Sequence, residues 1–246
     1  MENRPIPIRF ARRRAALLLA LPLAAGCAAP GQRAAPAGGP SPTPAAPTTA
    51  AGAAGQPTTT VAAPPAGALV FRVITEQSKA TFRVREQLVG VELPSDAVGT
   101  TGAVGGQLAL RPDGTLVSEA SKITVDLREL KTDDPRRDNF IKQNTLQTSR
   151  FPFAEFVPTQ AEGLPSPLPA SGEHAFRLTG NMTVHGVQKA VGWDVRARRD
   201  AAQLTGRATT TLKFGDFGMA PPRVPVVVSV VDEIRLELDL VAAQAT

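Results

Sequence analysis

The chain of 246 residues carries few side chains that could do covalent or metal chemistry. Its histidines are His174 and His185, and its single cysteine is Cys27. A Ser-His-Asp site needs a histidine base hydrogen-bonded to both partners, whereas His174 follows a Ser-Gly-Glu turn and His185 precedes Gly186 in a predicted hairpin turn. These residues are also too few for a zinc site or a disulfide framework. We therefore expect no catalytic residues, no metal site and no enzyme activity.

Glycines and paired acidic residues do not indicate a site either. The glycines of residues 99–106 lie between candidate strands rather than before a helix. They therefore predict barrel bends or a flexible loop instead of a phosphate-binding loop. The acidic pairs at 133–134 and 232–233 fall at loop edges, where solvated charge is the usual role. The apolar residues remain as the candidates for function.

The basic character of the chain comes largely from its N-terminus. Lys and Arg number 27 against 22 Asp and Glu, a net charge of +5. Residues 1–26 hold five arginines and one glutamate, so the rest has 22 basic and 21 acidic residues, a net charge of +1. Nucleic-acid binding through phosphates needs clustered basic residues in the folded part. We expect no nucleic-acid partner.

Residues 1–26 predict an export signal. The arginines at 12–14 precede an apolar run of 12 residues, Ala15 to Gly26, interrupted only by Pro22. Spanning a bilayer takes about 20 apolar residues, so this run fits the hydrophobic region of a secretory signal. Both general secretion and twin-arginine export are compatible with this segment.

The end of the apolar run, Leu23-Ala24-Ala25-Gly26-Cys27, resembles the lipobox of bacterial lipoprotein signal peptides. The resemblance implies that Cys27 is diacylated and becomes the first residue of the mature chain. The alternative is an ordinary cleaved signal with a buried cysteine. Acyl chains hold a protein on a membrane without spanning it. We expect an exported, membrane-anchored lipoprotein, periplasmic or on the outer cell surface.

Residues 28–67 have the composition of a tether. These 40 positions contain 14 Ala, 9 Pro, 7 Ser or Thr and 6 Gly, with Arg33 as the only charge. Val61 is their only large apolar side chain, so little burial offsets the entropy of ordering. The sequence thus predicts three parts: a signal peptide (1–26), a lipidated Cys27 with a disordered Ala/Pro/Thr-rich tether (27–67) and a folded domain (68–246).

The folded part alternates apolar and polar residues with a period of two. Alternating stretches run over 80–85, 176–184, 191–198, 205–214 and 234–240. Successive side chains of a strand point to opposite faces, so each stretch has one apolar and one wetted face. A parallel sheet covered on both faces would give continuous apolar runs instead. The pattern predicts antiparallel strands.

Turn signals and one helix signal complete the fold prediction. Residues 112–114 (Pro-Asp-Gly) and 185–186 (His-Gly) separate candidate strands. Asp134 and Pro135 are suited to the N-cap and first position of a short helix that fades by Thr148. About 175 residues of short strands fit a barrel or a sandwich, and a barrel is favoured because closure removes exposed edges. We expect an all-β barrel of about eight strands with one short helix.

The interior of such a barrel has two possible states. Eight strands enclose a space that side chains can just fill, or that can hold one slender ligand. The inward-facing positions mix bulky residues with glycine and alanine. This mixture is compatible with a channel and equally with interdigitated packing.

Eight stretches, in order, carry a family resemblance. They are Val73–Phe82, Ile123–Leu127, Asp134–Ile141, Phe151–Phe156, Leu178–Val187, Thr209–Leu212, Gly215–Met219 and Asp232–Ile234. Jointly they resemble the YceI-like family of lipid- and polyisoprenoid-binding proteins, from about residue 70 to 242. This chain departs from the family at Gln77, where a histidine is common, and in two loops, Val98–Gly106 and Pro221–Pro225.

The resemblance implies an extended, lipocalin-like antiparallel barrel with a long apolar tunnel. The ligand would be an isoprenoid, such as the tail of a quinone or a polyprenyl phosphate, or else a fatty-acyl lipid. No cofactor would be required. The oligomeric state stays open. The alternative is a structural or protein-interaction barrel with a filled core and no ligand. The candidate tunnel residues are Phe82, Phe140, Phe153, Phe176, Gly180, Met182, Trp193, Gly206, Phe214 and Phe217.

Overall fold

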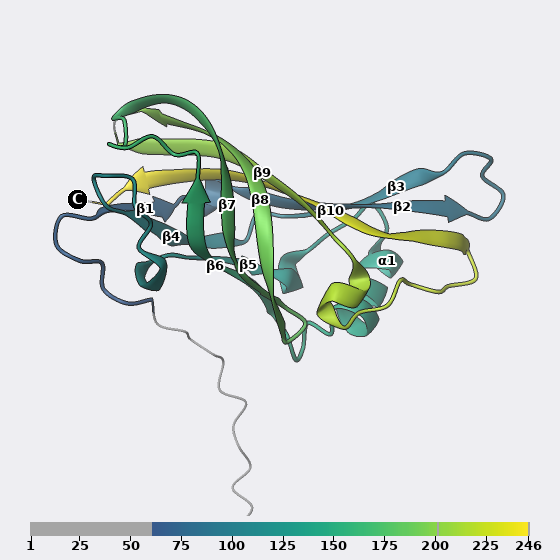
Figure 1. Cartoon of the computed structure of the whole chain (residues 1–246). Helices are drawn as coiled ribbons and strands as arrows, with labels where there is room; N and C mark the ends of the chain where they lie inside the picture. Colours follow the sequence, from purple (N-terminus) through teal and green to yellow (C-terminus); the bar gives the residue numbers. More distant parts are fainter. Residues whose placement is uncertain (1–60, 201, 246) are drawn as a thin grey trace, which may run out of the picture. The chain divides into compact units, whose positions relative to one another are not determined.

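The computed structural model describes residues 61–200 and 202–245 (Figure 1). The predicted signal peptide, Cys27 and most of the predicted tether lie outside the described residues. The described part contains ten strands and one short α-helix. The strands are β1 (Leu69–Val73), β2 (Lys79–Leu88), β3 (Ser95–Thr101), β4 (Val104–Leu110), β5 (Lys122–Asp126), β6 (Phe153–Glu162), β7 (Ser171–Val184), β8 (Val187–Asp200), β9 (Gln203–Leu212) and β10 (Val227–Gln244).

Eight of these strands close into a barrel. Hydrogen-bonded neighbours follow the order β1-β4-β5-β6-β7-β8-β9-β10, and β10 pairs back with β1, where Phe71 lies opposite Gln244. Each of these pairings is antiparallel. The pairing of β1 with β10 joins the two edges that an open sheet of these eight strands would leave free. The predicted antiparallel barrel of about eight strands with one short helix is confirmed.

Strand β10 has two partners on one side. Its last residues, 242–244, pair with β1, whereas residues 227–239 pair with β2, which in turn pairs with β3. On its other side β10 meets β9 only over residues 234–243. The first residues of β10 therefore extend beyond the closed ring together with the β2–β3 hairpin (Figure 1).

The register of the long strands keeps the apolar faces aligned. Between β9 and β10, Ala208 lies opposite Leu238 and Leu212 lies opposite Ile234. Since side chains alternate across a strand, a slip of one residue would turn the whole apolar set outward. The predicted alternation is thus realised as an inner apolar face and an outer polar face.

Local sequence sets the turns and the helix. His185 and Gly186 have φ angles of 52° and 75°, the positive values that a two-residue type I′ hairpin requires at both positions. Helix α1 (Pro135–Phe140) starts as predicted, because the Asp134 carboxylate accepts a hydrogen bond from the Arg136 amide at 2.8 Å. It runs directly into a π-helical segment, Ile141–Thr145.

The glycine-rich stretch 99–106 is mostly strand, so the flexible loop offered as one interpretation is wrong. Gly99 belongs to β3 and lies beneath the ring of Phe82, which occupies the space where a Cβ atom would stand. Gly106 belongs to β4 and has a φ of 117°, a conformation that favours glycine. Close packing and backbone conformation explain these two glycines.

Candidate functional site

A cavity of about 800 Å³ extends through the interior of the barrel. Binding pockets for small molecules usually measure about 300–1,000 Å³. Side chains from the barrel strands line most of it, helix α1 contributes at one end, and Leu164 and Leu168 of the loop after β6 line the other. The lumen of this barrel is therefore hollow rather than filled.

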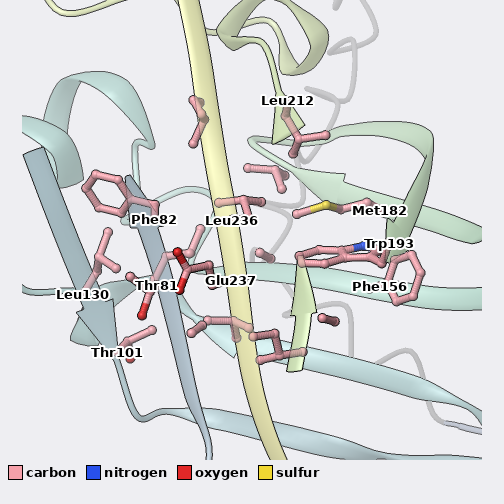
Figure 2. A pocket seen from close by; sticks show the side chains of 18 of the residues that line it. Thr81, Phe82, Thr101, Leu130, Phe156, Met182, Trp193, Leu212, Leu236 and Glu237 are labelled. Carbon is pink, nitrogen blue, oxygen red and sulfur yellow. The ribbon is translucent and has the colours of Figure 1, made fainter. Parts of the chain in front are cut away.

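The middle of the cavity is walled by aromatic and aliphatic side chains. Figure 2 shows Phe156 of β6, Met182 of β7 and Trp193 of β8 on one side, with Leu212 of β9 and Leu236 of β10 beside them. The rings of Phe156 and Trp193 meet edge to face, with centroids 6.0 Å apart. Such a wall offers burial to an apolar chain and few hydrogen-bonding groups.

The structure brings together eight of the ten candidate tunnel residues and separates two. Those on the cavity wall are Phe82, Phe140, Phe176, Met182, Trp193, Gly206, Phe214 and Phe217. Phe153 and Gly180 do not line it. Contact of any of these residues with a ligand stays a prediction.

Phe153 and Gly180 have structural contacts instead. The Phe153 ring lies 5.2 Å below the Arg128 guanidinium, a cation–π contact away from the cavity. Gly180 is buried against β6, where an added Cβ would stand 2.6 Å from the Cα of Pro158 and 2.8 Å from the Phe156 ring. Placing Gly180 as a gap in the tunnel was wrong, because its missing side chain makes room for the neighbouring strand.

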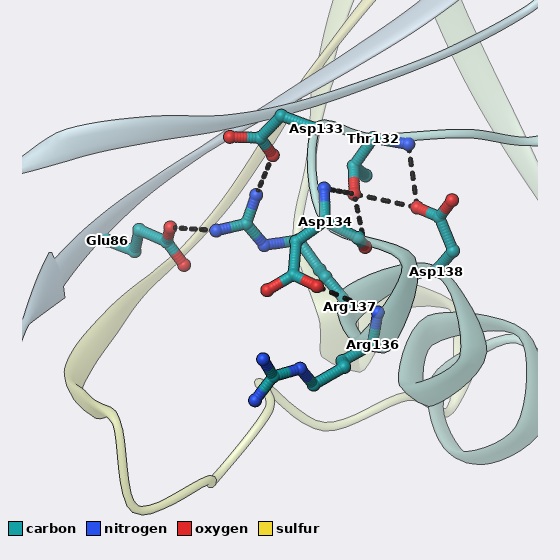
Figure 3. Close-up of polar contacts among 7 residues, drawn as sticks. All are labelled: Glu86, Thr132, Asp133, Asp134, Arg136, Arg137 and Asp138. Atoms are coloured by element: carbon teal, nitrogen blue, oxygen red, sulfur yellow. Dashed lines mark hydrogen bonds and ion pairs between the residues drawn. The ribbon is translucent and has the colours of Figure 1, made fainter.

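One cation at the α1 end of the cavity is held by two carboxylates. Arg137 Nη2 lies 2.8 Å from Glu86 Oε1, and its Nη1 pairs with Asp133 (Figure 3). The Glu86 side chain is only 7% exposed. A buried carboxylate needs such a partner, since leaving it unpaired costs far more than the net value of the pair.

The charged side chains that line the cavity at this end carry no net charge. The charged side chains drawn in Figure 3 are Glu86, Asp133, Asp134, Arg136, Arg137 and Asp138. Of these, Glu86, Asp134, Arg136 and Arg137 line the cavity, two carboxylates against two guanidinium groups. Among the ion pairs of the described residues, Arg136 takes part in none.

The opposite end of the cavity is covered by the loop between β6 and β7. Arg199 Nη1 donates to the Pro169 carbonyl at 3.0 Å, and its guanidinium lies 5.3 Å above the Phe71 ring. Arg199 Nε and the neighbouring wall residue His174 each keep a buried nitrogen without a hydrogen-bond partner. This end therefore contains polar atoms buried within the cavity wall.

Trp193 presents a further donor without a partner. Its side chain is 7% exposed, and its Nε1 makes no hydrogen bond. A buried donor left unpaired costs roughly 1–3 kcal/mol. The Trp193 side chain lines the cavity, whereas its N–H is covered by neighbouring protein atoms.

The carboxyl groups with shifted pKa lie away from the cavity wall. The hydrogen bond from the Arg128 side chain lowers the pKa of Asp126, and the hydrogen bond from Lys189 lowers the pKa of Asp216. A backbone hydrogen bond from Thr115 lowers the pKa of Asp113. None of the three aspartates lines the cavity. These pKa shifts result from hydrogen bonds away from the lumen and mark no acid–base pair in it.

Within residues 61–200 and 202–245, no three His, Cys, Asp or Glu side chains come together as metal ligands. In the same part of the chain, no helix combines the length and the hydropathy needed to span a bilayer.

Several wall residues were absent from the sequence prediction. Phe156 lines the cavity while Phe153 does not, and an odd spacing of three places them on opposite faces of β6. The alternation around Phe156 could have found it. The valines of residues 224–230 have no alternation to reveal their role, and the Glu86–Arg137 pair joins segments 51 residues apart.

The closed antiparallel strands and the cavity place this protein in the class of hollow β-barrels. Its sequence further shows the family. The chain belongs to the YceI-like domain family, which it matches over residues 71–242. Two UPF0312 proteins of Pseudomonas putida, strains GB-1 and W619, are each 34% identical over 113 residues. That alignment covers 42% of this chain, which spans 55% of the length of these curated relatives.

Solved structures share the fold. Burkholderia cenocepacia BcnA is 19% identical, with a TM-score of 0.53 over 71% of this chain and 99% of its own. A polyisoprenoid-binding domain from Saccharophagus degradans is 11% identical, with a TM-score of 0.55 over 72% and 99%. The YceI protein of Campylobacter jejuni is 17% identical, with a TM-score of 0.51 over 65% and 91%. At these identities the likeness concerns the fold alone.

Proposed function

We propose that this protein holds the apolar tail of an isoprenoid or another long-chain lipid in its barrel cavity and serves as a carrier or store. The observation that carries the proposal is the cavity of about 800 Å³ walled by aromatic and aliphatic side chains. Burying apolar surface contributes about 25 cal/mol per Å², so each 100 Å² of tail contributes roughly 2.5 kcal/mol before binding costs. Binding then needs no covalent step and no cofactor.

The charge at the α1 end favours a neutral head group. A phosphate placed there would add charge to a set of side chains that already balances, with Arg137 engaged by Glu86 and Asp133. Like charges at close range disfavour each other, most strongly where water is scarce. A quinone ring or an alcohol adds no charge, and a neutral polar group costs far less to bury than a charged one. We therefore favour an isoprenoid quinone over a polyprenyl phosphate.

The predicted lipid anchor fits this role. Acylated Cys27 and the tether would keep the exported barrel next to the bilayer in which such lipids dissolve. The lipobox resemblance supports this part of the proposal. The rival function is a structural or protein-interaction barrel with a filled core. The hollow lumen argues against it.

Two measurements test the proposal. Organic extraction of the purified protein followed by mass spectrometry should yield a prenyl or acyl lipid in stoichiometric amount, beyond any modification of Cys27. Trp193 is the only tryptophan and the chain lacks tyrosine, so its fluorescence reports directly on the lumen. An isoprenoid quinone should quench this fluorescence saturably.

A polyprenyl monophosphate of equal tail length serves as the matched competitor. We expect it to compete at least ten-fold more weakly than the quinone. Equal or stronger competition would reject the neutral head group while keeping the lipid tail. Repeated extraction without any lipid, together with no quenching by either compound, would favour the rival function.

A further inference from the structure

Six large aliphatic side chains are highly exposed among the described residues, and all six lie on two segments. They are Val89 (61%), Val91 (45%), Leu93 (77%), Val226 (66%), Val228 (65%) and Val231 (49%). Single exposed aliphatic residues are common on protein surfaces, whereas a contiguous group marks an interaction site. We name residues 88–94 and 222–231 together the lip.

The two segments of the lip are joined by backbone hydrogen bonding. The Val89 amide donates to the Val226 carbonyl at 3.0 Å, and Val227 lies opposite Leu88 in the β2–β10 ladder. β9 does not pair with this part of β10, so the lip projects beyond the closed ring (Figure 1). Its apolar side chains thus form one continuous surface at one end of the barrel.

This surface is continuous with the cavity. Val89, Val91 and Val226 are exposed to solvent and also line the cavity. Val227 and Val230 of the same segment line the cavity as well. The cavity therefore opens at the lip. A lipid tail leaving through this opening would meet either the exposed valines or water.

The charges around the lip suit a neutral apolar environment. Glu92 and Arg223 are its only charged residues, and their charges cancel. Behind the lip, Asp96 pairs with Arg85 at 3.2 Å and with Arg235 at 2.8 Å. Apolar side chains at such an end can be buried at the boundary between lipid head groups and acyl chains, while the paired charges behind them stay in water.

We infer that the lip docks onto a lipid bilayer, so that a tail passes between membrane and cavity without crossing water. The transfer step rests on the proposed function, whereas docking itself does not. The chain outside the structure permits this orientation. The 33 residues from 28 to 60 span at most about 110–120 Å, against about 60 Å for the 18 residues of β10. A barrel tethered through Cys27 could therefore turn its lip toward the same membrane.

Residues that are exposed but do not line the cavity allow docking to be tested apart from binding. Leu93, Val228 and Val231 have this property. The full chain carrying Cys27→Ser is floated with phosphatidylcholine vesicles, alone and with Leu93→Ser, Val228→Ser and Val231→Ser combined. We expect the triple variant to partition at least ten-fold more weakly while quenching of Trp193 by an isoprenoid quinone is unchanged. A triple variant with isoleucine at the three positions should partition like its parent.

A local probe separates the lip from the N-terminal segment. In a Trp193→Phe, Cys27→Ser background, Leu93→Trp and Gln203→Trp are compared on phosphatidylcholine vesicles brominated on the acyl chains. Gln203 is exposed at the start of β9, the end of the barrel away from the lip (Figure 1). We expect strong quenching of the tryptophan at 93 and none at 203.

Equal quenching at the two positions would overturn the docking surface, as would equal flotation of parent and serine variant. A concentration-dependent dimer lost in the serine variant, without quenching at 93, would assign the lip to a second copy of the chain. Loss of quinone quenching with docking intact would reject the proposed function alone.

Discussion

Arg137 of helix α1 and Glu86 of strand β2 form an ion pair at the end of the cavity, 2.8 Å apart and separated by 51 residues of sequence. The pair fastens the helix to the strand that leads into the lip. Glu86 is buried and Arg137 is 23% exposed, so water screens the interaction incompletely. Helix α1 has only six residues and depends on such contacts for its place.

Replacing Arg137 with methionine should destabilise the protein. The change keeps much of the side-chain volume but leaves the Glu86 carboxylate buried without its partner, at a cost of about 1–3 kcal/mol. The free energy of unfolding from urea titration measures this. Adding Glu86→Gln to Arg137→Met should recover at least half of the loss, because the unpaired charge is removed.

Arg136→Met is the matched control for that experiment. Arg136 is the exposed neighbour of Arg137 and forms no ion pair within the described residues. We expect a change of at most about 0.5 kcal/mol. An equal loss of stability in both variants would mean that the Glu86–Arg137 pair does not hold the helix.

Gly180→Ala tests the corrected role of that glycine. Its Cβ would stand 2.6 Å from the Pro158 Cα, so β6 and β7 must separate, at a cost of roughly 1–3 kcal/mol. Gly105, also in a strand, has nothing within 4 Å of an added Cβ. Gly105→Ala should therefore leave the urea midpoint unchanged or raised, whereas Gly180→Ala lowers it. The reverse order would restore Gly180 as a gap in the tunnel wall.

The alternation of residues predicted which faces are apolar, because that period is local to each strand. It could not decide whether the lumen is filled, since the lumen width depends on the number and stagger of all eight strands. The role of Gly180 was equally hidden. It depends on the irregular register between β6 and β7 at Pro158 and Gln160, which no single strand reveals.

Two functional features escaped sequence analysis for physical reasons. The lip contains the run Val226–Val228, in which apolar residues follow one another without a polar residue between them, so the sequence does not show which of them line the cavity. Arg137 lies in the first turns of helix α1, where exposed charges are common, so its place in the sequence does not reveal a buried partner. Its partner Glu86 comes from the far end of β2, a contact that tertiary structure alone creates.

Acid should weaken the contact between Lys189 and Asp216. The hydrogen bond from Lys189 holds the pKa of Asp216 below 3.8, its ordinary value. A carboxyl group with a depressed folded-state pKa stabilises the fold above the unfolded-state pKa and loses this contribution as pH falls through the folded-state pKa. The melting temperature of Asp216→Asn should lie below that of the parent at pH 6 and converge with it as the pH falls through the depressed folded-state pKa, below 3.8. A constant difference across this range would contradict the electrostatic origin.

Filling the lumen should abolish ligand uptake without unfolding the barrel. Ala208 of β9 lines the cavity and lies opposite Val195 in the β8–β9 ladder, so a phenylalanine there would project into the lumen that a lipid tail needs. Thr209 is the next residue, exposed on the outer face of the same strand. We expect Ala208→Phe to weaken saturable quinone quenching of Trp193 at least ten-fold, whereas Thr209→Phe leaves it within two-fold. Circular dichroism checks that both variants keep the β spectrum. If Ala208→Phe binds quinone as tightly as Thr209→Phe, the ligand lies outside this part of the cavity, because a side chain projecting into an occupied lumen must displace its occupant.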